Sequence, residues 1–87
     1  MSADAIFIKR RREHGRRYGN WDELPTGGRC YWRDIAGRRP GWCARYCLEV
    51  DAQEQTLRFW QEIYNADGRL VETHQKFPVD TGHQQVP

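Results

Sequence analysis

No stretch of this 87-residue sequence is apolar for anything near the roughly 20 residues that a membrane-spanning helix needs. The first twelve residues also lack the order of a secretory signal, because their basic run follows only a short apolar patch. Three cysteines are an odd number and a poor basis for a disulfide framework. These absences predict a cytoplasmic protein with reduced thiols and no membrane partner.

Recognisable metal and cofactor motifs are lacking too. Gly27-Gly28 is not part of a phosphate-binding loop, and no Walker or nucleophile-elbow pattern occurs elsewhere. Cys43 and Cys47 are four residues apart in a strand-like segment, which separates their Cα atoms by about 13 Å, too far for a disulfide or a shared ion. The sequence therefore predicts neither a metal nor a cofactor.

Aromatic side chains, in contrast, are plentiful: four Trp, four Tyr and three Phe. Each can bury roughly 150–250 Å², so together they can supply a thin core for one small domain. We expect a single domain over residues 1–87, with a basic segment and loop over 1–28, an antiparallel sheet over 29–78 and a tail over 79–87. So small a core suggests marginal stability, which favours a homodimer or another partner.

Charge is divided unevenly along the chain. Residues 1–45 contain eleven Lys and Arg against five Asp and Glu, a balance of +6, whereas residues 46–87 contain three against seven, a balance of −4. The basic clusters at residues 9–12, 16–17 and 38–39 suit phosphate groups. The alternative is a solvated basic face or a free N-terminal arm.

The predicted fold class is α+β: a three- to four-stranded antiparallel β-meander with a short N-terminal helix. We expect the helix within residues 3–16, a loop over 21–28 and a loose tail over 81–87. Strand-like patterns cover residues 29–35, 42–50, 57–64 and 69–77. Residues 65–68, Asn-Ala-Asp-Gly, suit a type I turn with Gly68 in the left-handed region.

That turn predicts a register for the sheet. It pairs Asn65 with Arg69, and hence Ile63 with Val71. Keeping apolar residues on one face then gives two further pairs, Val50 with Leu57 and Leu48 with Phe59. The predicted core face carries Leu57, Phe59, Ile63, Val71 and Phe77. The opposite face consists of three cross-strand rows: Glu49–Arg58–Lys76, Cys47–Trp60–His74 and Arg45–Glu62–Glu72.

These rows carry the functional predictions. A Trp among cations suits base stacking with phosphate contacts beside it, which predicts binding of single-stranded nucleic acid, RNA in particular. The predicted nucleic-acid contacts are Trp60, Arg45, Arg58, Lys76 and Tyr64. The alternative is an ordinary solvated face, whose exposed ion pairs contribute only ~0–1 kcal/mol each.

Metal-independent cleavage of RNA is an extension of this hypothesis. It needs a base, an acid and a cation at the phosphate. We assign the first two roles to His74 and Glu62 and the third to Arg58, with Arg45 or Lys76 as substitutes. A histidine is chosen because its ordinary pKa lies near neutrality.

Residues 62–68, followed by Asp80-Thr81-Gly82, resemble the last hairpin of colicin-type ribonuclease toxins. The resemblance covers about a quarter of the chain and consists mainly of turn residues. The catalytic Asp-x-x-His-x-x-x-Glu run of that family has no counterpart, since no histidine lies between His14 and His74. No site residue is therefore carried over.

The second functional hypothesis is a non-enzymatic protein-interaction module of the phage, toxin–antitoxin or regulatory accessory kind. Such a module would act through a sheet edge or exposed aromatics, for example as a homodimer. The basic clusters favour nucleic acid as the partner, and the acidic C-terminal half favours a protein.

Overall fold

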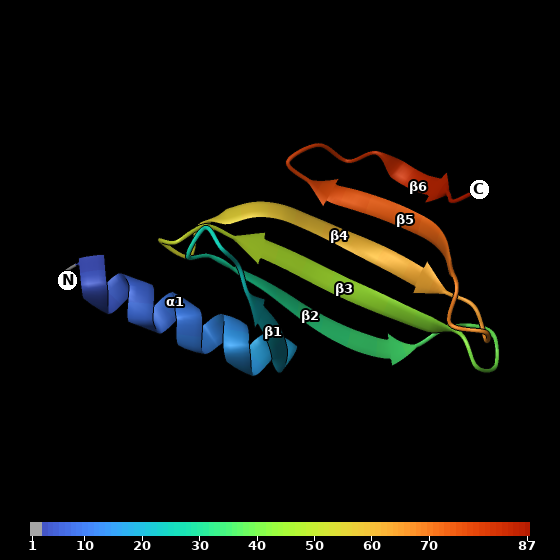
Figure 1. Ribbon diagram of the computed structural model, residues 1–87, viewed down its shortest axis with the longest axis horizontal. Coiled ribbons are helices and arrows are strands. Elements are labelled where there is room, and N and C mark those ends of the chain that lie inside the picture. The colour runs from blue at the N-terminus through green and yellow to red at the C-terminus, as the bar shows by residue number, and fades with distance from the viewer. Residues whose placement is uncertain (1–2) are drawn as a thin grey trace.

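The computed structural model describes residues 3–87, with side chains from Asp4 onwards, and these residues form one helix and six strands (Figure 1). The elements are α1 (Ala3–Tyr18), β1 (Asn20–Glu23), β2 (Arg29–Ala36), β3 (Cys43–Val50), β4 (Thr56–Tyr64), β5 (Leu70–Phe77) and β6 (Gly82–Gln85). The strands make one antiparallel sheet in chain order. The α+β class and the meander are confirmed, but the sheet has six strands instead of three to four.

The two strands that the sequence does not predict lie at the edges of the sheet. β1 pairs with β2, with Trp21 opposite Tyr31, in a segment predicted to be a loop. β6 pairs with β5, with His83 opposite His74, in the predicted tail. Both strands have four residues, the lower limit at which an alternating pattern can be recognised. Their extended backbone therefore depends on hydrogen bonds to the neighbouring strand.

Helix α1 packs against one face of the sheet along a stripe at helical spacing. Arg11, His14 and Tyr18 make its contacts, and Phe7, at the same spacing one turn earlier, lies against Arg11. Tyr18 is buried, and its ring centroid lies 6.1 Å from that of Tyr31 on β2. Gly19 follows with a φ of +83°, a left-handed conformation that ends the helix.

The hydrophobic core lies between α1 and this side of the sheet, which we call the covered face. Its buried residues are Tyr18, Tyr31, Leu48 and Val50, with Tyr46 and Phe59 packed against them. Tyr46, Leu48 and Val50 of β3 all lie on the covered face. This agrees with the prediction that Arg45, Cys47 and Glu49 occupy the opposite face. Leu57 and Phe77 were expected in the core, but they are 47% and 46% exposed.

The pairing of β3 with β4 follows the prediction along most of its length. Leu48 lies opposite Phe59, as expected. The predicted pair of Val50 with Leu57 is wrong, because Val50 lies opposite Thr56. Leu57 is the extra residue of a β-bulge, which explains its exposure.

The β4–β5 hairpin closes as predicted. The Asn65 amide donates to the Arg69 carbonyl at 2.9 Å, and Gly68 has a φ of +78°. Beyond the turn, however, Val71 is an extra residue, so that Ile63 lies opposite Glu72.

Side chains alternate along a strand, so this bulge places most of the β5 side chains on the face opposite to the predicted one. Gln75 lies opposite Trp60, in the place predicted for His74. Thr73 lies opposite Glu62, in the place predicted for Glu72. The β5 members of all three predicted rows are therefore wrong.

Candidate functional site

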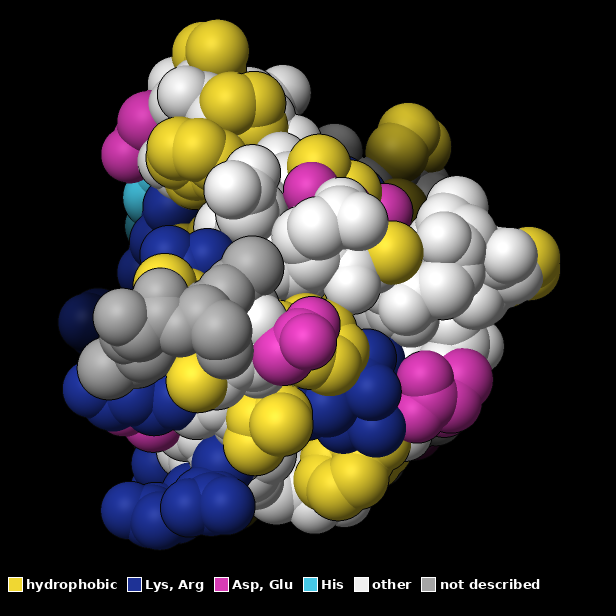
Figure 2. Space-filling view, turned by 90° about the vertical axis from the view of Figure 1, so that its left-hand side faces the viewer, with side chains coloured by type: hydrophobic (Ala, Val, Ile, Leu, Met, Phe, Trp, Pro, Cys, Tyr) yellow, Lys and Arg dark blue, Asp and Glu magenta, His cyan; other side chains and the backbone are white. Residues whose placement is uncertain are grey.

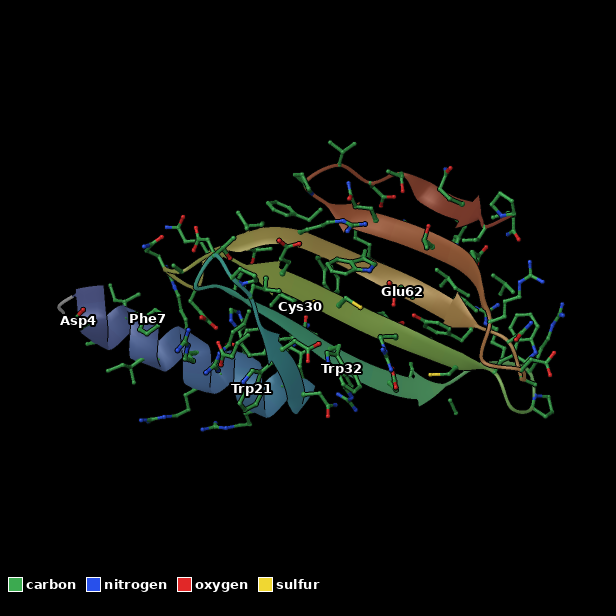
Figure 3. All side chains as sticks on the ribbon, viewed as in Figure 1. Asp4, Phe7, Trp21, Cys30, Trp32 and Glu62 are labelled. Carbon is green, nitrogen blue, oxygen red and sulfur yellow. The ribbon has the colours of Figure 1, made fainter. Side chains whose placement is uncertain are left out.

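Five of the seven predicted site residues share the side of the sheet away from α1, which we call the open face. These five are Arg45, Arg58, Trp60, Glu62 and Tyr64. Cys30 and Trp32 of β2 project from the same face (Figure 3). The other two predicted residues, His74 and Lys76, lie on the covered face.

Trp60 is a buried aromatic, with 9% of its surface exposed. The guanidinium carbon of Arg58 lies 4.2 Å from the centroid of its ring. The indole Nε1 donates to Glu62 Oε2 at 3.0 Å, and the Tyr64 hydroxyl donates to Glu62 Oε1 at 2.7 Å. Burial, followed by this last hydrogen bond, raises the pKa of Tyr64 to about 12. The Trp60 ring is therefore covered by Arg58, and both oxygens of the Glu62 carboxylate already accept hydrogen bonds from neighbouring side chains.

Arg45 is held in the same way. Its Nε and Nη2 atoms donate to the two carboxylate oxygens of Asp34 at 2.7 and 3.0 Å, and its guanidinium lies 4.2 Å from the Trp32 ring centroid. These hydrogen bonds lower the pKa of Asp34. Cys47 on the same face is buried, and burial raises its pKa to about 12. The charge of the Arg45 guanidinium is thus already neutralised by the Asp34 carboxylate, which makes Arg45 a poor phosphate-binding group.

His74 and Lys76 lie beyond the part of the covered face that α1 reaches. His74 Nε2 is 2.6 Å from Asp80 Oδ1, and its ring centroid is 4.5 Å from that of His83. A backbone hydrogen bond and then His74 lower the pKa of Asp80. The sheet itself separates His74 from Glu62, so the structure does not bring the predicted acid–base pair together.

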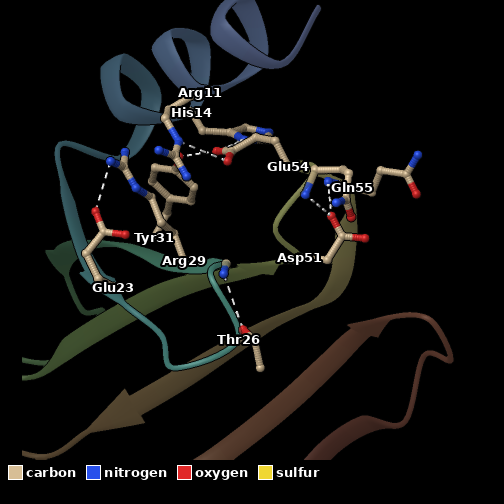
Figure 4. Close-up of polar contacts among 11 residues, drawn as sticks. Arg11, His14, Glu23, Thr26, Arg29, Tyr31, Asp51, Glu54 and Gln55 are labelled. Carbon is tan, nitrogen blue, oxygen red and sulfur yellow. Dashed lines mark hydrogen bonds and ion pairs between the residues drawn. The ribbon is translucent and has the colours of Figure 1, made fainter. Parts of the chain in front are cut away.

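A polar cluster that was not predicted from the sequence lies between α1 and the sheet (Figure 4). At its centre is Glu54, from the loop between β3 and β4, which is 1% exposed and the one charged residue buried among the described residues. Glu54 accepts a hydrogen bond from the Tyr31 hydroxyl. Its Oε1 lies 3.2 Å from His14 Nδ1, and its Oε2 lies 3.4 Å from Arg11 Nε.

The loop over residues 51–55 holds Glu54 in a strained conformation. Its φ of +67° lies in the left-handed region, which residues with a side chain rarely adopt. Asp51 fixes this turn, because its Oδ1 accepts from the amides of Gln53 and Gln55, both at 2.9 Å. Strain of this kind costs of order 1–3 kcal/mol and concentrates at functional sites.

Tyr31 forms the floor of the cluster and is fully buried. Burial, followed by the hydrogen bond to Glu54, raises its pKa to about 12. Arg29 lies beside it, with Nη2 at 2.9 Å from Glu23 Oε1 and its guanidinium at 4.8 Å from the Trp21 ring centroid. The buried Arg29 Nε has no hydrogen-bond partner among the residues that the structure describes.

An open hollow of about 360 Å³ adjoins the cluster. It is lined by Arg10, His14, Glu54, Gln55 and Thr56. His14 is held through Nδ1, whereas its Nε2 makes no hydrogen bond within the described part of the chain. The geometry thus leaves one imidazole nitrogen for a ligand in the hollow.

The exposed side of α1 carries five cations: Lys9, Arg10, Arg12, Arg16 and Arg17. Within residues 4–87 none of them forms an ion pair with a carboxylate. Figure 2 views the end of the molecule at which α1 begins and shows dark blue Lys and Arg side chains gathered along its lower left side. We call this surface the basic side of α1.

The sequence contains a signal for part of this site. The spacing of Phe7, Arg11, His14 and Tyr18 is helical and could have placed His14 on an inward stripe. Glu54 gives no such signal, because polar residues in turns are normally exposed.

Comparisons with protein-family models, with curated proteins and with solved structures find no match to this chain. Among the described residues, no helix is both long and apolar enough to cross a membrane. A proposal of function therefore depends on the geometry of the molecule itself.

Proposed function

We propose that the protein binds single-stranded nucleic acid, RNA in particular, through the basic side of α1. The observation that carries this proposal is the group of five exposed cations on one helix, none of which is paired with a carboxylate in the described chain. Cations that are not neutralised by the protein can release counterions from phosphates, which drives binding. Arginine adds bidentate contacts to phosphate oxygens.

The size of the surface supports a short, single-stranded contact. At 1.5 Å per residue, the helix from Lys9 to Arg17 is about 12 Å long, enough for a few phosphates. Trp21 lies against α1 beside Gly15, within 3.5 Å of where a Cβ would be, and is 43% exposed. Arg29 lies over this ring, 4.8 Å from its centroid, but the ring is far more exposed than Trp60. An exposed ring beside a row of cations supports stacking of an unpaired base.

The open face contributes less to this proposal than the sequence indicates. Trp60 is covered by Arg58, and Arg45 is paired with Asp34. Binding is therefore expected to depend on α1 more than on the predicted contacts of the open face.

Anisotropy of a labelled 2′-O-methyl RNA of mixed sequence, measured at several salt concentrations, tests the proposal. The variant Arg12→Gln/Arg16→Gln removes two cations from the basic side of α1. We expect its affinity to fall at least tenfold. We also expect the slope of log affinity against log salt to decrease by about 1.4, since each phosphate that is no longer neutralised reduces it by about 0.7.

The matched control, Arg38→Gln/Arg69→Gln, makes the same change of net charge at two exposed positions on other parts of the chain. Its affinity for the RNA should stay close to that of the natural protein. An equal weakening of binding in both variants would refute a site on α1.

The alternative, a protein-interaction module that pairs through a sheet edge, has less support. The edge strands β1 and β6 have four residues each. β1 also carries Asp22 and Glu23, and short, charged edge strands are a common protection against pairing with other chains.

A further inference from the structure

We infer that His14 and Glu54 form a site for acid–base cleavage of RNA in the hollow beside α1. This inference rests on the proposed function, because the same helix carries His14 and the cations that would hold the RNA. His14 would be the catalytic base and Glu54 the residue that positions it.

The hydrogen bonds of Glu54 define which nitrogen of His14 is free. Tyr31 and Arg11 both donate to this carboxylate, and His14 Nδ1 lies 3.2 Å from its Oε1. A carboxylate offers only acceptor oxygens to its neighbours. His14 Nδ1 therefore carries the hydrogen that points to Glu54. In the neutral ring Nε2 is then an unprotonated base, and the ring borders the hollow.

The guanidinium at the hollow suits a phosphodiester. Arg10 lines the hollow, is exposed and has no carboxylate partner among the described residues. A guanidinium at this position can hold a phosphate and stabilise the charge that develops on it during cleavage.

The reaction is a transesterification at phosphorus. His14 Nε2 takes the proton of the ribose 2′-hydroxyl, and the 2′-oxygen forms a bond to phosphorus. The bond from phosphorus to the 5′-oxygen breaks, and that oxygen takes a proton from water. The products are a 2′,3′-cyclic phosphate and a 5′-hydroxyl, and the imidazolium returns its proton to the solvent.

A purely structural role explains the cluster less well. An apolar side chain at position 54 could anchor α1 without a buried charge, and buried ionic groups often stabilise no better than apolar ones. Instead the chain places a carboxylate there in a strained conformation, with φ at +67°. The turn itself needs a left-handed residue at this position, which Gly68 fills in the equivalent β4–β5 turn. Glycine would adopt that conformation without strain, yet the chain has a glutamate there.

The test compares cleavage of an unmodified RNA with binding of its 2′-O-methyl counterpart, which has no 2′-hydroxyl to react. The main variant is His14→Asn, since the Asn amide nitrogen can replace Nδ1 as the donor to Glu54 but nothing replaces Nε2. We expect cleavage to fall at least 100-fold, with binding of the 2′-O-methyl RNA and the circular dichroism spectrum unchanged. His14→Ala, with imidazole added to the solution, is expected to recover part of the activity. His83→Ala, at the far end of the sheet, is the matched control and should cleave normally.

Glu54→Gln separates positioning from folding. It keeps the size and a hydrogen-bonding group, and we expect a lower kcat with an unchanged KM. A positioning role is overturned if only the thermal stability changes.

The outcomes separate the two proposals. Binding without cleavage by the intact protein would overturn the inference and leave the proposed function standing, whereas the absence of both would remove both. Cleavage that survives in His14→Asn, or that disappears in His74→Ala, would also overturn the assignment to His14.

Discussion

Tyr31 is the residue at which the core and the polar cluster meet. Its ring packs between Tyr18, His14 and Trp21, with centroids 5.2 to 6.1 Å away, and its hydroxyl donates to Glu54. The hydroxyl is the neutral partner of a buried carboxylate. Its pKa is raised chiefly because burial disfavours the charged phenolate, and further because removal of the proton would break the hydrogen bond to Glu54 and place two negative charges side by side.

We expect the stability of the protein to decrease above about pH 10 because of Tyr31. Its pKa is raised to about 12 in the folded state and is about 10 in an unfolded chain. The stabilisation from this shift is fully present below pH 10 and is lost as the pH rises towards 12. Between pH 9 and pH 11 the free energy of unfolding should fall by about 1–2 kcal/mol more in the natural protein than in Tyr31→Phe. Urea unfolding of both proteins at the two pH values measures the difference, and parallel decreases would show that Tyr31 does not ionise in this way.

At the scale of elements, the loop between β1 and β2 comes very close to the end of β3 at Gly28. No other glycine leaves so little space for a Cβ atom. A Cβ at Gly28 would lie 2.0 Å from the carbonyl oxygen of Val50. This oxygen belongs to the backbone of a central strand and cannot move away as a flexible side chain could. Glycine is therefore required there by close approach, whatever its φ.

A pair of glycine substitutions tests this contact against helix propensity. Gly28→Ala should lower the free energy of unfolding by about 2–3 kcal/mol, because either β2 or β3 must shift. Gly15→Ala, in the interior of α1, should raise it by roughly 0.5–1 kcal/mol, because its Cβ would meet Trp21 at an ordinary 3.5 Å. Thermal or urea unfolding gives both values. A stable Gly28→Ala protein would mean that the loop can move away from Val50.

At the scale of the whole molecule, α1 is the one element that covers the sheet among the described residues. The core residue Tyr18 comes from the helix, and Tyr31, Leu48 and Val50 lie beneath it. The rest of the molecule is a single twisted layer of six strands (Figure 1). The same helix thus completes the core and carries the basic side, so the proposed binding surface depends directly on the fold.

We expect a chain that begins at Gly19 to lose cooperative folding. Without α1, Tyr31, Leu48 and Val50 would be exposed to water and Glu54 would lose its partners on the helix, Arg11 and His14. A single two-sided sheet is rarely stable without a covered face. Circular dichroism during heating measures this, with the natural protein as the reference. A sharp transition in the shortened chain would show that the sheet is stable alone.

Features that depend on neighbouring residues could be predicted from the sequence. The alternation of Ala44, Tyr46, Leu48 and Val50 specified β3 and its covered face, because strand side chains alternate with a period of two. The turn at residues 65–68 specified a hairpin, because Gly68 can adopt a left-handed conformation without strain. The cluster of basic residues 9–12 indicated the surface that the proposed function uses. It lies in the helix expected within residues 3–16, which extends to Tyr18.

Features that depend on long-range contacts became visible only in the folded chain. The bulge at Val71 placed His74 on the face away from Glu62. Most residues of β5 are polar, so the sequence of this strand has no clear alternation from which a shift of one residue could be recognised. Edge strands β1 and β6 exist because a neighbour supplies their hydrogen bonds. Glu54 is buried because its loop meets α1 at His14, 40 residues away in the sequence. The candidate site is therefore made of residues whose roles arise from tertiary contacts, which local sequence patterns do not encode.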